Sequence, residues 1–397
     1  MKSFNVDYKF KDLKFIEEAI IKTCTSKKKS RKGNNRKYNQ AQHILDNLEK
    51  YIKKTLETIL AFEEMQKIKS HGGKIDIKTF KKAYKPKKCD PFITRDNPSR
   101  KERKITSAPL FPDQVIHQLI VMAMEPVLMK YMYRHSYGSV PGRGVHKGKQ
   151  YVEKIINRHT KHNKSEIKYA AQLDISKCYK NIPHKELKKQ LNNKFRGRFF
   201  LDLSFAVIDS YRDNLEGEPI GIPIGYSTSH WFCNFLLTPL DHAIKQEFRV
   251  RYYIRYMDDM VLFGRNKKEL HKTVRLIMKR LKKIGLKIKY NWQVFRFDYL
   301  DKYKRRRGRD IDFLGYRFFR DKIILRKRNA LILRRQAMSL YKKNQISGHD
   351  ARSFMSRLGW LRHCNSYNYY HKYIKPYINT KKIKEVISHE SRKYNQA

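Results

Sequence analysis

The sequence is poor in acidic residues, with 37 Asp and Glu against 90 Lys and Arg among its 397 residues. The resulting formal net charge of +53 repels itself in a compact chain unless a polyanion shares the surface. Solubility alone does not need so one-sided a balance, and 26 tyrosines add rings on which bases can stack. The composition therefore favours a nucleic acid as the binding partner.

Cysteines are few and dispersed. No two of them form a CxxC pair, and they stand at Cys24, Cys89, Cys178, Cys233 and Cys364. This spacing argues against a zinc site or a disulfide framework and fits a reducing cytoplasm.

Long apolar runs are also missing. No run approaches the roughly 18 residues that a membrane-spanning helix needs. The start, Met1-Lys2-Ser3-Phe4, lacks an apolar signal segment. We therefore expect a cytoplasmic protein that has no membrane partner.

The N-terminal third is basic and then helical. Residues 1–40 include the basic run 27–32, which is typical either of a disordered arm or of a segment that contacts RNA. Apolar residues at helical spacing predict one or two amphipathic helices over residues 40–68. Residues 74–106 read as short strands and turns.

The middle of the chain alternates between strand and helix patterns. Strands are expected at Tyr169–Leu173 and on both sides of Asp258-Asp259, and a helix is expected to open at Pro112-Asp113. Further helices are expected around residues 184–194, 228–247 and 267–284, and two or three more within the last 70 residues. The alternation predicts an α+β fold with an antiparallel sheet.

Three aspartates carry the pattern of a catalytic centre. Asp258 and Asp259 stand between apolar strand formers, and Asp174 ends an apolar strand upstream. Nucleotidyl transfer uses two divalent ions about 4 Å apart, held by carboxylates from separate strands. The other interpretation of the Asp-Asp pair is a polar β-turn, because Asp is favoured in turns.

Four segments resemble the motifs of reverse transcriptases, in the order of that family. Tyr256-Met257-Asp258-Asp259 resembles the YxDD box, and Asp174–Tyr179 resembles the first palm motif. Gly221–Gly225 resembles the motif beneath the template and the incoming nucleotide. Phe313-Leu314-Gly315-Tyr316 resembles the primer grip.

The resemblance implies a metal site. Asp174, Asp258 and Asp259 would be the catalytic residues, and together with the carbonyl of Ile175 they would hold two Mg²⁺ ions, for which Mn²⁺ can substitute.

The resemblance also implies a nucleotide site. Lys101 and Arg103 would grip the triphosphate, although a solvated basic turn is the alternative. Tyr179 would exclude a ribose 2′-hydroxyl, with a core tyrosine as the alternative. Ile224 and Gly225 would lie against the nucleotide.

A right-hand polymerase architecture follows from the resemblance. We expect an N-terminal extension at 1–75, fingers at 76–170 interleaved with the palm, an antiparallel palm at 171–325 and a helical thumb at 326–397. The expected partners are an RNA template (a dedicated structured RNA), a DNA or RNA primer, dNTPs and an accessory protein.

Within the family, the sequence is similar to bacterial diversity-generating retroelement and group II intron-like enzymes. The signs are Gly138–Gly144, Ile224-Gly225 with Ser227-Thr228-Ser229, and Gly359–His363. High-fidelity relatives usually carry Gln where this chain has Ile224, so we expect reduced fidelity. Tyr226 and His230 depart from the diversity-generating pattern, which leaves a defence-associated relative open.

Reverse transcriptases often carry a lysine after the helix that follows the YxDD box, and Trp292 occupies that position here. Lys287 or Lys289 could substitute for it as a proton donor to pyrophosphate.

Two other functions compete with RNA-templated DNA synthesis. One is template-independent or protein-primed synthesis at the same centre, for which the tyrosines offer many hydroxyls. The other is a catalytically retired fold that binds or chaperones RNA, which the same basic surface would serve.

Overall fold

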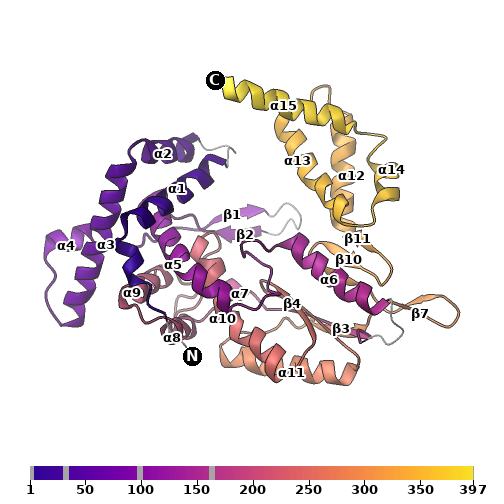
Figure 1. Ribbon diagram of the computed structural model, residues 1–397, viewed down its shortest axis with the longest axis horizontal. Helices are drawn as coiled ribbons and strands as arrows, with labels where there is room; N and C mark the ends of the chain where they lie inside the picture. Colours follow the sequence, from indigo (N-terminus) through magenta and orange to yellow (C-terminus); the bar gives the residue numbers. More distant parts are fainter. Residues whose placement is uncertain (1–3, 30–34, 96–101, 161–165, 397) are drawn as a thin grey trace.

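The computed structural model describes residues 4–29, 35–95, 102–160 and 166–396 (Figure 1). The α-helices are α1 Leu13–Lys29, α2 Asn35–Asp46, α3 Leu48–Ser70, α4 Ile77–Lys82, α5 Val115–Tyr131, α6 Val145–Thr160, α7 Cys178–Asn181, α8 His184–Lys194, α9 Arg198–Asp209, α10 Ser227–His242, α11 Lys267–Lys283, α12 Lys327–Tyr341, α13 Gly348–Leu358, α14 Tyr367–Tyr373 and α15 Thr380–Gln396. Short 3-10 or π turns are η1 Asp7–Lys11, η2 Leu110–Gln114, η3 Ala243–Glu247 and η4 Gly359–His363.

The strands fall into four small sheets. They are β1 Phe92–Arg95, β2 Glu102–Ile105, β3 Tyr169–Asp174, β4 Tyr252–Tyr256, β5 Asp259–Gly264, β6 Gln293–Arg296, β7 Tyr299–Leu300, β8 Arg306–Arg307, β9 Ile311–Phe313, β10 Tyr316–Phe318 and β11 Ile323–Leu325. The four-stranded sheet has the order β4-β5-β3-β6, and all of its neighbouring strands are antiparallel. The mixed helix and antiparallel-sheet prediction is therefore confirmed.

This central sheet separates two hydrophobic cores. Successive side chains of a strand point to opposite faces, so Leu262 belongs to one core while Val261 and Phe263 belong to the other. Helices α5, α10 and α11 fill the first core, and α11 contacts β3, β5 and β6 directly. Figure 1 shows α11 beneath the sheet, whereas α6 lies on its other side. The sheet is thus buried on both faces, and its strand ends remain available for a site.

The N-terminal segment is not a disordered arm where the structure describes it. Helix α1 buries Ile16, Ala19, Ile20 and Cys24 completely and packs on α5. These four residues recur at three- and four-residue spacing, which puts them on one face of a helix. The high positive charge of residues 1–40 suggested a disordered arm and obscured this helical pattern. The prediction of a disordered arm was therefore wrong for the described part of the segment. Part of the basic run 27–32 lies outside the described residues.

Besides α1, the sequence did not predict four of the helices in the described ranges: α4, α6, α7 and α9. Helix α9 is capped by a distant residue, because the Asp7 carboxylate accepts hydrogen bonds from the N–H groups of Phe199 and Phe200 (3.1 and 2.9 Å). These N–H groups have no partner within their own helix. An N-cap supplied from so far along the chain leaves no local signal in the sequence.

The C-terminal part joins the second core through a three-stranded sheet, β11-β10-β9, and the helices α12 to α15. Figure 1 shows these helices as a separate group above the central sheet. Four helices form where two or three were expected. Across the described ranges, none of the helices combines the length and apolar character needed to cross a membrane.

Candidate active site

The three predicted catalytic aspartates lie at neighbouring strand ends. Strands β4 and β5 form a hairpin whose turn is Met257-Asp258, and Asp174 pairs directly with Asp259 in the β3–β5 register. The Ile175 N–H donates to the Asp258 carbonyl (3.2 Å), which ties the end of β3 to the turn. Residues far apart in the sequence are therefore held together by sheet register, as the sequence predicted.

The carboxylates of this group disfavour one another's charge. Desolvation, then the charges of Asp258 and Asp174, raise the pKa of Asp259 to about 7. Desolvation and Asp174 also raise the pKa of Asp258, whereas Lys289 and Arg103 lower it. Asp259 is exposed to solvent, so water screens part of the repulsion between its carboxylate and the other two. Raised carboxyl pKa values of this kind mark a site that lacks positive charge.

A lysine partly supplies that charge. Lys289 Nζ contacts Asp174 Oδ2, and the Lys289 N–H donates to the Asp174 carbonyl (2.8 Å). Asp174 Oδ1 is buried and has no hydrogen-bond partner among the described residues.

Oxygen donors are the ligands that Mg²⁺ prefers, so an orphaned carboxylate oxygen beside two crowded carboxyls fits a divalent cation. Across the described part of the chain, however, no three His, Cys, Asp or Glu side chains already stand in metal-holding positions.

A buried charge network, which sequence reasoning missed, holds the catalytic turn. Arg255 and Asp241 are both 0% exposed and form an ion pair at 2.6 Å. Arg255 Nη1 also donates to the Met257 carbonyl and to Asn234 Oδ1, each at 2.9 Å. Tyr253 donates its hydroxyl to the same Asp241 carboxylate (2.7 Å). The network fixes the backbone of Met257, which has a left-handed φ of +53°.

Gly138 completes this support. A Cβ at Gly138 would lie 2.5 Å from the Met257 side chain and 2.6 Å from its backbone nitrogen. The Gly138 carbonyl accepts a hydrogen bond from Asn234 Nδ2 (2.8 Å). The sequence did carry a signal for this network, because Arg255 stands within the apolar strand Tyr252–Tyr256. A charged residue on a buried strand needs a buried partner.

The β1–β2 hairpin brings Arg103 toward the carboxylates. Strands β1 and β2 pair antiparallel, and Arg103 lies on β2 opposite Thr94. The positive charge of Arg103 is one of the influences that lower the pKa of Asp258. Lys101, the other predicted triphosphate residue, lies outside the described residues.

Ile224 and Gly225 contact the residue that follows strand β2. The Thr106 N–H donates to the Ile224 carbonyl (2.8 Å), just beyond β2. Gly225 has φ +121°, and a Cβ there would overlap the Thr106 carbonyl oxygen. Only glycine fits this close approach. The Gly221–Gly225 segment, which is predicted to contact the nucleotide, is therefore in direct backbone contact with the residue that follows β2.

Tyr179 is held by two interactions. Its carbonyl accepts from the Ile222 N–H (2.8 Å), and its hydroxyl bonds His230 Nδ1 on α10 (2.7 Å). The Tyr179 side chain is half-buried and packs against the first core. Its position beside the Gly221–Gly225 segment agrees with the predicted nucleotide site, and its role in sugar selection remains a prediction.

The predicted primer-grip segment forms the tight turn between β9 and β10. Leu314 and Gly315 have φ of +55° and +81°, which is the backbone of a two-residue hairpin turn. Tyr316 stacks on Trp360 with ring centroids 5.4 Å apart. A cavity of about 320 Å³ joins this turn to the carboxylate site; its lining includes Asp259, Tyr256, Leu314, Gly315, Arg326, Arg357 and Trp360.

The basic run at 304–309 is partly neutralised, because three of its arginines pair with aspartates. Arg305 and Arg307 pair with Asp301, and Arg306 pairs with Asp298 and Asp321. Figure 1 shows the β7 hairpin extending away from the sheet. These ion pairs reduce the charge that the arginines offer to phosphates.

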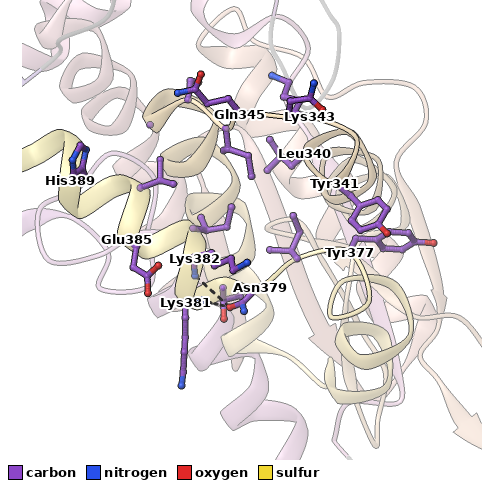
Figure 2. A pocket seen from close by; sticks show the side chains of 18 of the residues that line it. Leu340, Tyr341, Lys343, Gln345, Tyr377, Asn379, Lys381, Lys382, Glu385 and His389 are labelled. Atoms are coloured by element: carbon purple, nitrogen blue, oxygen red, sulfur yellow. Dashed lines mark hydrogen bonds between the residues drawn. The ribbon is translucent and has the colours of Figure 1, made fainter.

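A larger hollow, about 1600 Å³, lies among the C-terminal helices (Figure 2). Leu340 and Tyr341 line it from α12, and Lys382 and Glu385 line it from α15. None of the three catalytic aspartates lines it, so size alone does not identify the active site.

The sheet and its carboxylates define the class of protein. An antiparallel sheet with Asp258 on a hairpin turn, Asp259 at the start of the following strand and Asp174 opposite it is typical of the palm of a template-directed polymerase. The family model described as reverse transcriptase (RNA-dependent DNA polymerase) matches residues 93–318. This match covers more than half of the sequence, and the chain belongs to that family.

Individual relatives are more distant. The chain is 28% identical over 160 residues to the putative COX1/OXI3 intron 2 protein of Saccharomyces cerevisiae, a match to 39% of this chain and 17% of that protein. Telomerase from Candida albicans with a fragment of telomeric RNA is similar at TM-score 0.46 and 14% identity, covering 82% of this chain and 60% of that one. Apo telomerase from Candida tropicalis gives TM-score 0.45 and 14% identity, covering 69% and 53%.

Proposed function

We propose that this protein is an RNA-directed DNA polymerase that transfers nucleotides from dNTPs to a primer 3′-hydroxyl on an RNA template. The observation that carries the proposal is the register that sets Asp174 opposite Asp259, beside Asp258 on the hairpin turn. Family membership and the net charge of +53 also support RNA-directed DNA synthesis.

The roles of the side chains follow from their positions. Asp174, Asp258 and Asp259 would hold two Mg²⁺ ions, which when bound would activate the 3′-hydroxyl and neutralise the triphosphate. Arg103 reaches the same charges from the fingers and would grip the triphosphate through its fork of donors. Tyr179 and Ile224-Gly225 would line the site for the sugar and the base of the incoming nucleotide. Leu314 and Gly315 would support the primer end beside Asp259.

Labelled dNTP incorporation on a primed RNA template tests this proposal. Wild-type protein should extend the primer only with Mg²⁺ or Mn²⁺, and Asp258→Asn should abolish extension while leaving RNA binding intact. If folded wild-type protein binds RNA but never extends any primer, the proposal is wrong and the RNA-binding function replaces it. Omitting the template or the primer distinguishes template-independent or protein-primed synthesis.

We further propose that the enzyme serves a bacterial retroelement and copies RNA inaccurately. Support comes from Ile224, which offers no side-chain amide where high-fidelity relatives have one. Its backbone is fixed by Thr106, so a substitution changes the side chain without moving the segment.

Ile224→Gln should therefore lower the misincorporation rate several-fold. Sequencing of cDNA products measures this rate, with Ile222→Val as a conservative control in the same segment. Equal error rates in wild type and Ile224→Gln would contradict low fidelity through this residue.

A further inference from the structure

The hydroxyl of Tyr179 bonds a residue outside the predicted nucleotide-site motifs, His230. His230 stands on the first turns of α10, and its Nδ1 lies 2.7 Å from the Tyr179 hydroxyl oxygen. The two rings meet edge to face, with centroids 5.8 Å apart and planes at 84°. A tyrosine is thus anchored where a phenylalanine would be held by packing alone.

The charge of His230 follows from its surroundings. Burial lowers the pKa of His230, so the ring is neutral near pH 7. A neutral imidazole has one N–H donor and one acceptor nitrogen, and the tyrosine hydroxyl can donate or accept, so either tautomer forms the bond at Nδ1. The anchor is therefore a neutral hydrogen bond between two half-buried groups.

The anchor fixes the ring at its far end. The near end is fixed by the backbone, because the Tyr179 carbonyl accepts from the Ile222 N–H in the segment that leads to Ile224-Gly225. His230 also lines a small cavity of about 160 Å³ together with Gly225, Tyr226 and Ser227. His230 therefore lies next to both the Tyr179 hydroxyl and the segment that ends at Gly225.

A ring excludes a 2′-hydroxyl only if it cannot swing aside. We infer that His230 is a positioning residue for sugar selection, holding Tyr179 where it separates dNTPs from rNTPs. This inference rests on the proposed polymerase function and on Tyr179 as the residue that meets the sugar. His230 acts through Tyr179 and touches no reacting atom.

The test compares kcat/KM for a dNTP and for the matching rNTP in single-nucleotide extension on a primed RNA template. His230→Phe keeps a ring but removes Nδ1, and Tyr179→Phe removes the hydroxyl; each variant therefore removes this one hydrogen bond. Each should lower the dNTP preference by about threefold to tenfold, the range that one net hydrogen bond supports. The double variant should be no worse than either single variant, because both remove the same bond.

Two further variants separate positioning from general damage. His230→Asn places an oxygen acceptor near the Nδ1 position and should restore most of the preference. His242→Phe removes a comparable hydrogen bond, from His242 Nε2 to the Tyr131 carbonyl (2.9 Å), on the same helix but away from Tyr179. It should leave the preference unchanged.

The outcomes are distinguishable. If folded wild type incorporates no dNTP, the proposed function fails and this inference fails with it. If wild type extends primers and Tyr179→Val relaxes sugar selection, but His230→Phe and Tyr179→Phe do not, the inference alone is overturned. Additive losses in the double variant would overturn it as well.

Discussion

Arg255 illustrates how one residue can serve the active site without reaching it. Its guanidinium makes contacts with Asp241, Asn234 and the Met257 carbonyl, all inside the core. A buried ion pair adds little net stability compared with apolar packing, but losing one partner is costly. The value of the pair here is geometric, since it fixes the turn that carries Asp258.

Arg255→Leu should lower the free energy of unfolding by about 3–5 kcal/mol, because Asp241 would keep a buried charge without its partner. Urea unfolding measures this loss. Arg251→Leu is a matched control just before the same strand, since the Arg251–Glu166 pair is 59% and 31% exposed and should contribute at most about 1 kcal/mol. Equal losses in the two variants would contradict a special role for Arg255.

Asp259 should make stability depend on pH. Its pKa in the folded protein is about 7, above the ordinary value of 3.8, so folding favours the protonated carboxyl. This contribution is complete below about pH 4 and is lost as pH rises toward 7.

Chemical unfolding of the metal-free protein between these pH values should therefore show stability falling with rising pH, and Asp259→Asn should reduce that slope. The sequence gives no hint of this shift, because it arises from carboxylates that sheet register brings together. An unchanged slope in Asp259→Asn would show that other groups cause the dependence.

At the scale of elements, the nucleotide site depends on how the fingers hairpin meets the segment before α10. The contact is a backbone hydrogen bond from Thr106 to Ile224 and a close approach at Gly225. Both belong to main-chain atoms, so side-chain chemistry alone cannot describe them.

Gly225→Ala should therefore destabilise the protein more than Gly144→Ala. The two glycines have similar backbones, with φ of +121° and +128°, but a Cβ at Gly144 meets nothing within 4 Å. Strain alone should cost about 1–3 kcal/mol at either position, and Gly225→Ala adds the overlap with the Thr106 carbonyl. Thermal unfolding compares them; similar losses would mean that the fingers move aside freely.

Elements with strong local patterns were predicted well. The β4–β5 hairpin, strand β3 and helices α3, α5 and α11 follow apolar periodicity closely. Helix α9 was missed although Phe200, Leu203 and Val207 recur at helical spacing, and only its N-cap comes from the distant Asp7. Helix α1 was misread because its basic residues masked four buried ones. In both helices the local apolar pattern was present, and only the packing partners lie far along the chain.

For the whole molecule, the excess positive charge predicts strongly salt-dependent RNA binding. Each neutralised phosphate contributes a slope of roughly −0.7 to −0.9 in log affinity against log salt. The arginines of the β7–β8 hairpin are paired with aspartates, so we expect them to contribute less than Lys302 and Lys304, for which no ion pair with a carboxylate appears among the described residues.

Fluorescence anisotropy with a structured RNA should therefore show affinity falling steeply from low to high salt. The double change Lys302→Ala and Lys304→Ala should make the slope shallower by about one to two units if both lysines meet phosphates. Arg305→Ala is the comparison within the same hairpin and should change the slope less. A flat salt response in wild type would contradict binding driven by charge.

By itself, the sequence determined the class of fold, the order of the motifs and the three carboxylates. These rest on local patterns: apolar alternation ending at Asp174, a turn at Asp258-Asp259, and one-sided charge. Only the tertiary structure decided which residues support them: Arg255 on the Met257 turn, Lys289 on Asp174 and His230 on Tyr179. Such pairs join positions distant in the chain, and their energies depend on burial and distance that only packing creates.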